Sequence, residues 1–351
     1  MECNNLVLRL YKILNSLQDE ESKIIFEARV AYLFTRNEDE YYKILEKVRK
    51  NSYCAELEDF LKDNQENQGI IIYGAEEEGV RTKKLLDSCG REATLFCDDS
   101  DKMIGGRVEG LEVVSLEQVI SKYGEYVVIL SRWSDLADMY SLLLRSGFPR
   151  KQILFPMYMH LVASNGIQYF DTLSPVKDEV FVDAGSYNGD TIREFIKWSK
   201  GEYKKIYAFE ANDEMIPVVE KYLASEQVKN VMFINKATWD KEEEVNFVKD
   251  ACASRVGEEG ADRIPAIDID SVVGDDKVTF IKMDVEGSEL HSLAGAQNTI
   301  KRNKPRLAIS VYHKPEDVVE IAEYILELVP EYRLMLRQYN SNFWETVLYA
   351  Y

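Results

Sequence analysis

The sequence predicts an α/β protein built from two mainly parallel sheets with helices on their faces. Short apolar runs alternate with segments of helical period from residue 70 onward, which is typical of strand–helix–strand units. Glycine turns follow two of these runs, at Gly74 and Gly185, and a segment rich in turn-forming residues separates two alternating stretches. A chain of 351 residues is also long for a single hydrophobic core, which favours more than one domain.

Residues 1–64 are expected to form a helical N-terminal segment. Apolar residues recur at helical spacing in three stretches, namely Leu6–Leu17, Tyr41–Val48 and Leu57–Leu61. Stripes of this kind normally pack against another surface. We therefore interpret the segment as a helical cap, or as a face for homo-oligomer formation, rather than as part of a catalytic centre.

Residues 65–156 are expected to form a small Rossmann-like α/β domain, because four apolar runs alternate there with three helical patterns. The predicted strands are Ile70–Tyr73, Ala93–Cys97, Val127–Ser131 and Ile153–Phe155, and the predicted helices are Val80–Ser88, Leu116–Tyr123 and Asp135–Ser146.

The start of this first sheet is a poor dinucleotide site. Gly74 and Gly79 frame a helix start, but Glu76–Glu78 stand where a further glycine is wanted, and their charges repel a pyrophosphate. Asp98 and Asp99 close the second strand, where ribose hydroxyls would be read; the alternative is a solvated turn shaped by nearby glycines. The segment resembles the small nucleotide-binding-like domain found ahead of some bacterial sugar-modifying enzymes, which implies substrate recognition or scaffolding.

Residues 157–178 form the predicted connection to a second α/β domain at 179–351. The first strand of this second domain is expected to end at Asp183. Further strands are expected at Lys205–Phe209, Val231–Lys236, Val245–Val248, Ala266–Ile269, Thr279–Met283, Arg306–Val311, Arg333–Gln338 and Thr346–Tyr351. The last two lie close together in the chain and are expected to form an antiparallel hairpin at the edge of a mixed sheet.

The stretch VFVDAGSYNGDT at residues 180–191 is the most informative motif of the chain, with YAFEAN following at 207–212. Gly185 and Gly189 allow a ligand to approach the backbone closely. Glu210 ends the next strand, where a carboxylate can accept hydrogen bonds from both ribose hydroxyls of a nucleoside. The turn reads G-x-x-x-G and needs no pyrophosphate at the helix start, so the pattern favours S-adenosylmethionine (SAM).

Other predicted site residues follow the neighbouring strands. Thr191 opens a helix, residues 235–238 end the third strand where an adenine would lie, and Asp284 and Glu286 follow the strand that ends at Met283. In an open parallel sheet these carboxyl ends face one crevice. We predict cofactor contacts at Asp183, Ala184, Gly185, Gly189, Thr191, Glu210, Ala211, Ala237, Thr238 and Asp284.

Residues from about 180 to 351 resemble the FkbM-type SAM-dependent methyltransferases. The matching pieces are VFVDAGSYNGDT, YAFEAN, IPAIDIDSVV, FIKMDVEGSELHSLAGAQNTI, RLAISVYHKPEDVVEIAEYI and WETVLYA, and the D-V-E-G-x-E core at 284–289 is the most specific of them. The resemblance implies a class I methyltransferase fold and O-methylation of a sugar, a polysaccharide precursor or a secondary metabolite. It also implies that Asp183, Gly185 and Glu210 contact the cofactor, and that Asp284 and Glu286 border the methyl group.

Methyl transfer to a hydroxyl requires in-line alignment and a proton acceptor. His313 is the most suitable general base by residue type, because the ordinary pKa of histidine lies near neutrality. Asp284 and Glu286 are the acidic alternatives. These three side chains could instead hold magnesium or manganese, but their spacing is not a recognised ligand motif, so a divalent metal is not favoured. His160 and His291 are interpreted as structural.

Composition excludes several classes of partner. The formal net charge is −19, which argues against nucleic acid or an anionic membrane surface and leaves a small-molecule or glycan acceptor. Five cysteines without a C-x-x-C pair favour reduced thiols. Without a signal-like N-terminus or an apolar run of about 20 residues, we expect a cytoplasmic protein with no membrane insertion.

The alternative function is a non-catalytic binding or scaffolding protein with a degenerate methyltransferase fold, because fold alone does not establish activity. Gly185, Glu210 and Asp284 are all present in the expected order. Because several independent signals agree, the sequence favours the enzyme.

Overall fold

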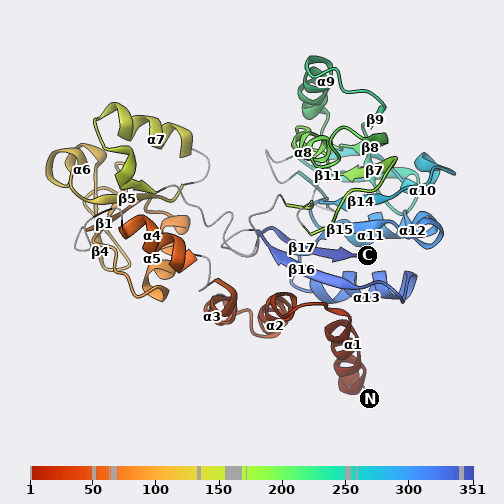
Figure 1. The fold of residues 1–351 in the computed structure, drawn as a ribbon, viewed down its shortest axis with the longest axis horizontal. Coiled ribbons are helices and arrows are strands. Elements are labelled where there is room, and N and C mark those ends of the chain that lie inside the picture. Colours follow the sequence, from red (N-terminus) through yellow and green to blue (C-terminus); the bar gives the residue numbers. More distant parts are fainter. Residues whose placement is uncertain are drawn as a thin grey trace. The chain divides into compact units, whose positions relative to one another are not determined.

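The computed structural model describes residues 2–49, 53–62, 64, 69–132, 136–154, 168–170, 172–249, 254–257, 260–339 and 344–351. The chain forms two compact units (Figure 1), of which the first comprises residues 1–45, 164–339 and 343–351 and the second comprises residues 46–163 and 340–342. The expected segment 1–64 has residues in both of these units. Its helices are divided between the units because Ile13 and Ile25 pack in one core, whereas Leu57 and Leu61 pack in the other.

A seven-stranded sheet forms the centre of the first unit, with the strand order β16-β17-β15-β14-β7-β8-β9. β17 pairs antiparallel with both of its neighbours, and the other pairs are parallel. The predicted class I methyltransferase sheet with its antiparallel hairpin is therefore confirmed. The strands are β7 (Glu179–Ala184), β8 (Tyr203–Phe209), β9 (Val231–Ile234), β14 (Phe280–Met283), β15 (Arg306–Ser310), β16 (Leu334–Gln338) and β17 (Thr346–Ala350).

Two of the predicted strands belong to a different sheet. β10 (Ala237–Thr238), β11 (Glu243–Val248), β12 (Arg255–Val256) and β13 (Asp262–Ile267) form a four-stranded sheet in the order β10-β13-β11-β12. Exposed positions alternate with buried ones in part of β11, as in antiparallel strands with one solvated face. The expected strand 266–269 ends early because the Asp268 side chain caps α10 (Ile269–Val273).

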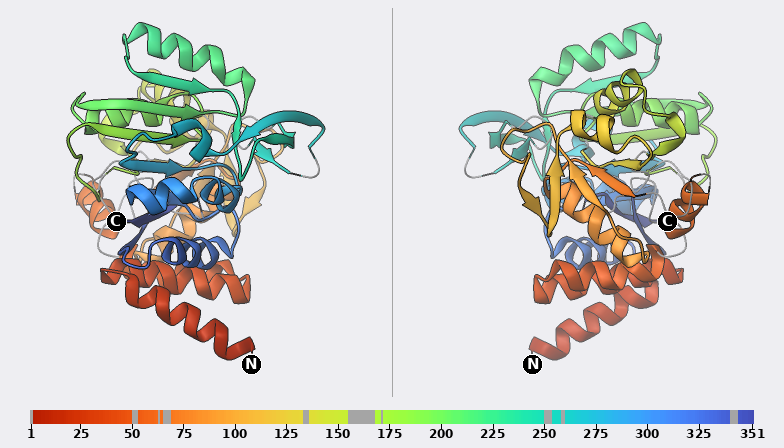
Figure 2. Two further views of the ribbon diagram at one scale, coloured as in Figure 1. Left: turned by 90° about the vertical axis from the view of Figure 1, so that its right-hand side faces the viewer. Right: turned by 90° about the vertical axis from the view of Figure 1, so that its left-hand side faces the viewer.

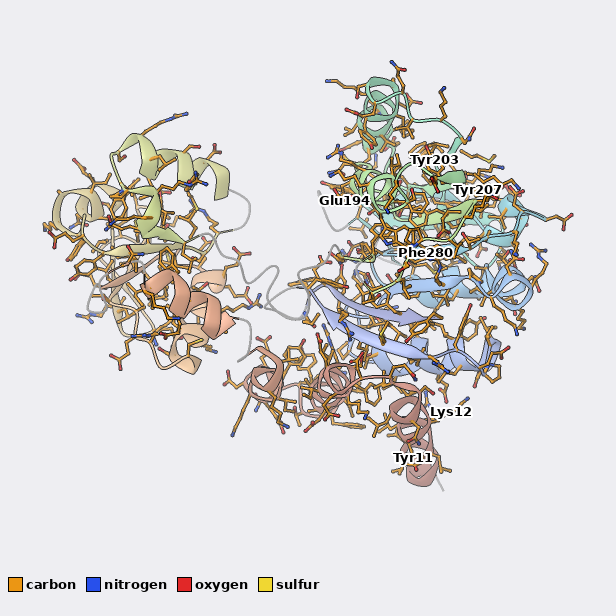
Figure 3. All side chains as sticks on the ribbon, in the orientation of Figure 1. Tyr11, Lys12, Glu194, Tyr203, Tyr207 and Phe280 are labelled. Carbon is orange, nitrogen blue, oxygen red and sulfur yellow. The ribbon has the colours of Figure 1, made fainter. Side chains whose placement is uncertain are left out.

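Helices cover both faces of the main sheet. They are α8 (Asp190–Trp198), α9 (Ile216–Ser225), α10, α11 (Glu289–Ala294), α12 (Gln297–Asn303) and α13 (Asp317–Leu328). On one face Phe181 stacks on Phe195 of α8 with ring centroids 4.3 Å apart, beside Phe280 of β14 (Figure 3). On the other face Ile281 packs in the same core as Ile321 of α13.

The N-terminal helices α1 (Glu2–Ser16), α2 (Glu20–Thr35) and α3 (Glu38–Arg49) extend this second face, and α1 and α2 lie next to α13 (Figure 2). Asp19 caps α2 through the Ser22 N–H and pairs with Arg337 of β16 at 2.9 Å. Val7, Leu8 and Tyr11 of α1 are exposed (Tyr11 is labelled in Figure 3). Homo-oligomer formation through these helices stays a prediction.

The second unit contains a six-stranded sheet in the order β3-β4-β2-β1-β5-β6. The hairpin of β3 and β4, which contains Gly110, was not among the predicted strands. Residues 155–167, including His160 and part of the expected connection, lie outside the described residues. The elements are α4 (Tyr53–Lys62), β1 (Ile70–Tyr73), α5 (Glu77–Ser88), β2 (Leu95–Cys97), β3 (Arg107–Val108), β4 (Leu111–Val114), α6 (Leu116–Lys122), β5 (Val127–Leu130), α7 (Leu136–Arg145) and β6 (Ile153–Leu154).

The two acidic residues after β2, Asp98 and Asp99, make hydrogen bonds and an ion pair with other residues of this unit. Asp98 is buried and accepts hydrogen bonds from the N–H groups of Ala75 and Ser100, at 2.8 Å each. Asp99 accepts a hydrogen bond from the Tyr73 hydroxyl at 2.8 Å and pairs with Arg132 at 3.0 Å. These contacts hold the turns at the carboxyl ends of β1 and β2.

The cysteines depart from the sequence prediction. Cys97 is buried with a free thiol, whereas Cys89 is disulfide-bonded, so the expectation of reduced thiols is wrong for Cys89. Spacing along the chain does not reveal which cysteines approach within the roughly 4.4–6.8 Å Cα separation that a disulfide needs. Among the described residues, no helix combines the length and the apolar character required to cross a bilayer.

Candidate functional site

A cavity of about 300 Å³ lies at the carboxyl ends of β7, β8 and β14, next to the point where the strand order reverses direction. Ligands of open α/β sheets bind at this kind of position, and the volume is at the lower end for small-molecule sites. Four non-glycine residues with positive φ line it, at Tyr169, Tyr187, Glu286 and Glu345. Backbone strain of this kind clusters at functional sites.

The turn after β7 requires glycine for a reason that the sequence did not reveal. Gly185 has φ +80°, and a Cβ built on it would lie 1.9 Å from the carbonyl oxygen of Asp284. Its close approach is therefore to the chain after β14 as well as to the cavity. Gly189 has φ +84° and is the N-cap of α8. Thr191 lies within the first turn of α8 and lines the cavity, and the N-cap position belongs to Gly189.

Glu210 lies at the end of β8 with its carboxylate fixed by backbone groups. Oε2 accepts a hydrogen bond from the Tyr187 N–H, and Oε1 accepts one from the Asn212 N–H, each at 2.7 Å. Burial raises the pKa of Glu210, against the opposing effect of these N–H groups. Each carboxylate oxygen keeps a further lone pair, so this residue can accept two more hydrogen bonds from a ligand in the cavity.

The third part of the cavity wall comes from the loop after β8 and from β10. Ala237 and Thr238, which belong to the segment predicted to border an adenine, line the cavity together with Ala211. The Thr238 Oγ1 lies 2.6 Å from the Ser292 Oγ of α11, which holds β10 against that helix. Small side chains at this wall leave room for a flat ring.

Asp183 and Lys282 form a buried pair on adjacent strands. They are register partners in β7 and β14, and Lys282 Nζ lies 3.2 Å from Asp183 Oδ1 while it donates a hydrogen bond to the Gly185 carbonyl at 2.6 Å. Burial raises the pKa of Asp183 to about 6, against the opposing effect of Lys282. Asp183 is fully buried and does not line the cavity. Its predicted contact with the cofactor stays a prediction; in the structure Asp183 pairs with Lys282, which does line the cavity.

Asp284 follows β14 and accepts hydrogen bonds from two tyrosines. The Tyr169 hydroxyl donates to Oδ2 at 2.8 Å and the Tyr312 hydroxyl donates to Oδ1 at 3.1 Å. Burial alone would raise the pKa of Asp284, but His313 and Lys282 lower it overall. This carboxylate is therefore held ionised in the cavity wall.

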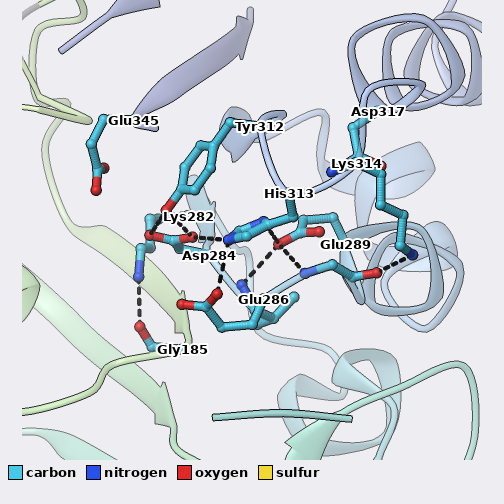
Figure 4. A network of polar contacts seen from close by, with 12 residues as sticks. Gly185, Lys282, Asp284, Glu286, Glu289, Tyr312, His313, Lys314, Asp317 and Glu345 are labelled. Carbon is cyan, nitrogen blue, oxygen red and sulfur yellow. Dashed lines mark hydrogen bonds and ion pairs between the residues drawn. The ribbon is translucent and has the colours of Figure 1, made fainter. Parts of the chain in front are cut away.

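His313 follows β15 and lies among carboxylates (Figure 4). Its Nε2 is 3.2 Å from Glu286 Oε2 and 3.5 Å from Asp284 Oδ1, and its Nδ1 is 3.0 Å from Glu289 Oε1. Burial alone would lower the pKa of His313, but Glu289, Glu286 and Asp284 raise it well above the ordinary value. These surroundings favour the imidazolium, which has no lone pair for an incoming proton, so they do not favour the predicted role as a base.

Glu289 stabilises the turn that carries Glu286 through a hydrogen bond with the backbone. Glu286 has φ +54° and Gly287 has φ +91°. Glu289 is buried, and its Oε1 accepts a hydrogen bond from the Val285 N–H at 2.9 Å. Lys314 Nζ donates to the Gly287 carbonyl at 2.5 Å. The D-V-E-G-x-E core thus directs Asp284 and Glu286 toward the cavity while its last acid fixes the turn.

The structure brings most of the predicted site residues together. Eight line the cavity: Gly185, Thr191, Glu210, Ala211, Ala237, Thr238, Asp284 and Glu286. Four do not line it: Asp183, Ala184, Gly189 and His313. The predicted structural residue His291 lies apart from this network, stacked on Trp239 with centroids 3.8 Å apart.

Sequence reasoning missed Tyr169, Tyr187, Lys282, Tyr312 and Glu345, all of which line the cavity. The charged Lys282 in the otherwise apolar strand FIKM was a signal for a buried ion pair. Burial raises the pKa of Glu345 to about 7, with Asp284 adding to the effect. Tyr169 lies in a segment with no strand or helix pattern, so no local signal placed it.

Comparison with known proteins identifies the domain that carries this cavity. A family model described as the methyltransferase FkbM domain matches residues 183–341. The structure of a methyltransferase FkbM from Methylobacillus flagellatus KT is similar, with a TM-score of 0.52 and 18% sequence identity over 95% of this chain and 99% of that one. No curated protein matches the chain significantly.

Two further solved structures are similar to about half of the chain. One is an rRNA methylase from Streptococcus thermophilus, with a TM-score of 0.34 and 18% identity over 50% of this chain and 86% of that one. The other is a SAM-dependent methyltransferase from Aquifex aeolicus, with a TM-score of 0.29 and 18% identity over 50% of this chain and 84% of that one. The strand order and the family match agree, and residues 183–341 form a domain of the FkbM methyltransferase family.

Proposed function

We propose that the protein is a SAM-dependent O-methyltransferase that methylates a hydroxyl of a sugar, a polysaccharide precursor or a secondary metabolite. The observation that carries the proposal is the position of Glu210. Its carboxylate is fixed by two backbone N–H groups and lines the same cavity as Asp284 and Glu286. Glu210 suits a ribose, and the other two acids suit a reacting hydroxyl.

The residues present fit the cofactor. Glu210 would accept hydrogen bonds from the ribose hydroxyls, and Ala211, Ala237 and Thr238 would border the adenine. The glycine turn at Gly185 would leave room for the amino-acid end beside Lys282. When bound, SAM supplies an electrophilic methyl group on a sulfonium; the protein's own part is to align the acceptor oxygen, which can contribute as much as about 7–11 kcal/mol.

The acceptor proton must leave as the new bond forms. Asp284 and Glu286 are the carboxylates of the cavity wall that would take up this proton. Their oxygens lie 3.5 and 3.2 Å from His313 Nε2. Tyr169 and Tyr312 orient the Asp284 carboxylate through their hydroxyls. His313 then acts as a positioning residue that offsets the charge of these acids.

A hydroxyl-rich acceptor suits the polar lining of the cavity, because carboxylates and tyrosine hydroxyls can hydrogen-bond neighbouring sugar hydroxyls. The overall negative charge opposes binding of a nucleic-acid acceptor. We propose a cytoplasmic enzyme for this reaction.

The test begins with calorimetric titration of the purified full-length chain with S-adenosylhomocysteine, followed by incubation with methyl-labelled SAM and a panel of sugars, nucleotide sugars and hydroxylated metabolites. We expect micromolar binding and a product whose label is on oxygen by NMR. A folded protein that binds neither SAM nor S-adenosylhomocysteine would overturn the proposal and favour the scaffolding alternative. Label on nitrogen or carbon would overturn O-methylation.

A further inference from the structure

Three potential ligand side chains from two separate segments converge beside the cavity. Asp284 and Glu286 follow β14, and His313 follows β15. One atom from each, a carboxylate oxygen or a ring nitrogen, can be chosen so that all three lie within 4.8 Å of one another. Figure 4 shows the His313 ring between the Asp284 and Glu286 carboxylates on one side and Glu289 on the other. Asp284 and Glu286 line the cavity, so this cluster is open on one side.

The separations match those of neighbouring ligands around a small divalent cation. Octahedral Mg²⁺ and similar ions hold their ligands at roughly 2.0–2.2 Å, which places adjacent donor atoms roughly 3 Å apart. His313 Nε2 lies 3.2 Å from Glu286 Oε2 and 3.5 Å from Asp284 Oδ1. Small side-chain rotations would bring the three atoms around one ion.

The His313 ring provides an independent observation. Its side chain is only 6% exposed, and both ring nitrogens face carboxylate oxygens at 3.0–3.5 Å without the angle that a direct hydrogen bond requires. Buried polar atoms nearly always have a partner. Nε2 faces the two carboxylates, where a divalent cation would take the place of the proton that the imidazolium carries on this nitrogen.

The other ring nitrogen faces a carboxylate of the kind that orients a metal-binding histidine. Nδ1 lies 3.0 Å from Glu289 Oε1, and that carboxylate is itself anchored on the Val285 N–H. Carboxylate–histidine–metal arrangements of this form fix the orientation of the ring. Glu286 adopts a strained backbone conformation, with φ +54°, and this conformation directs its side chain toward the same point.

The excess of negative charge around His313 also favours binding of a cation. Four carboxylates lie around the imidazole, whereas the buried ammonium of Lys282 is already paired with Asp183. Buried carboxylates are normally paired or coordinate metals. The four belong to Asp284, Glu286, Glu289 and Asp317 (Figure 4).

We propose that Asp284, Glu286 and His313 bind one divalent cation of the Mn²⁺ or Mg²⁺ class, with Glu289 as the positioning residue for His313. Two carboxylates and one imidazole suit these ions, and the open side leaves coordination positions for an acceptor hydroxyl. The role of the cation in lowering the pKa of that hydroxyl rests on the proposed function; the binding itself does not.

The experiment uses the full-length chain after treatment with EDTA and dialysis, with Mn²⁺ alone as the probe. Electron paramagnetic resonance of free Mn²⁺ gives stoichiometry and affinity, and pulsed measurements detect nitrogen coupling from a bound imidazole. We expect one ion per chain with imidazole coupling, and loss of that coupling in His313→Gln. Glu286→Gln should weaken binding by at least about tenfold, and Glu289→Gln by about 10–100-fold. The matched control is Glu220→Gln, at an exposed position of α9, which should leave the affinity unchanged.

Wild-type protein that shows no saturable Mn²⁺ binding, or binding without imidazole coupling, would overturn the proposal even if a variant fails to fold. Equal Mn²⁺ affinity in folded Glu286→Gln and Glu220→Gln would also overturn it. Titration of the metal-free wild type with S-adenosylhomocysteine separates the two proposals: cofactor binding without a Mn²⁺ site overturns only the cation site, and a Mn²⁺ site without cofactor binding overturns only the methyltransferase function.

Discussion

Replacement of Glu210 by alanine tests the ribose contact, on which the proposed function depends. The wild-type carboxylate already accepts hydrogen bonds from the N–H groups of Tyr187 and Asn212 at 2.7 Å each, so its orientation is fixed before a ligand arrives. Two ribose hydroxyls would then each donate to a charged acceptor. Hydrogen bonds to a charged group contribute about 1.5–3 kcal/mol each.

The lower end of that range for both bonds is about 3 kcal/mol, and about 1.4 kcal/mol corresponds to a tenfold change in affinity. We therefore expect Glu210→Ala to weaken binding of S-adenosylhomocysteine by at least about 100-fold. Loss of the carboxylate also leaves two backbone N–H groups without their acceptor. Because the cavity can admit water to them, the stability loss should stay near the low end of the range for unsatisfied groups, about 1–3 kcal/mol each.

The assay is calorimetric titration with S-adenosylhomocysteine at a temperature where circular dichroism shows the variant folded. Glu220→Ala, at an exposed position of α9, is the matched control and should bind as the wild type does. Glu210→Gln keeps the shape of the side chain but presents an amide donor to one of the two N–H groups, so it should bind nearly as weakly as the alanine variant. Affinity within about threefold of the wild type in folded Glu210→Ala would refute the ribose assignment.

Three further predictions concern stability and are measured by urea denaturation. Lys282→Met leaves the buried carboxyl of Asp183 without its partner and should cost about 3–5 kcal/mol, whereas the exposed Lys277→Met should change the free energy of unfolding by less than about 0.5 kcal/mol; equal effects would contradict the pair. Gly185→Ala should cost about 2–5 kcal/mol from its positive φ and the 1.9 Å contact, and Gly201→Ala, which has φ +75° with open space around it, should cost only about 1–2 kcal/mol. Burial would raise the pKa of Asp19, but Arg337 and Ser22 lower it overall. Its stabilising contribution should thus be present above its unfolded pKa of about 3.9 and lost as pH falls through the lower folded value; Asp19→Asn should remove this part of the acid dependence, and an unchanged profile would contradict the assignment.

The architecture of the first unit was predictable because its strands are apolar, short and separated by helical periods. The carboxyl ends of parallel strands meet at one edge, so the positions of Glu210 and Asp284 near one cavity followed from their places after two strands. The second sheet was not predicted as separate. Strands Glu243–Val248 and Asp262–Ile267 have the same local pattern whether they join one sheet or another, and only pairing partners distant in sequence decide between the two.

The missing parts of the site are tertiary in origin. Tyr169 reaches Asp284 over a separation of 115 residues, and nothing in its local sequence indicates that contact. The raised pKa of His313 depends on three carboxylates that only the folded turn gathers around it. Residue type alone therefore suggested a base, whereas the surroundings favour a charged or cation-bound imidazole.

Gly185 shows how a correct local rule can have a different physical cause. The sequence rule treats this glycine as room for a ligand, but the first atom that a Cβ would meet is the backbone oxygen of Asp284. The turn after β7 and the turn after β14 are thus in direct backbone contact. Lys282 of β14 adds a second link, because its Nζ donates a hydrogen bond to the Gly185 carbonyl. Any side chain at residue 185 would displace Asp284 along with the turn after β7. Since misplacement of reacting groups by about 1 Å can cost about 100-fold in rate, this contact would couple the geometry of the proposed cofactor site to that of the proposed acceptor site.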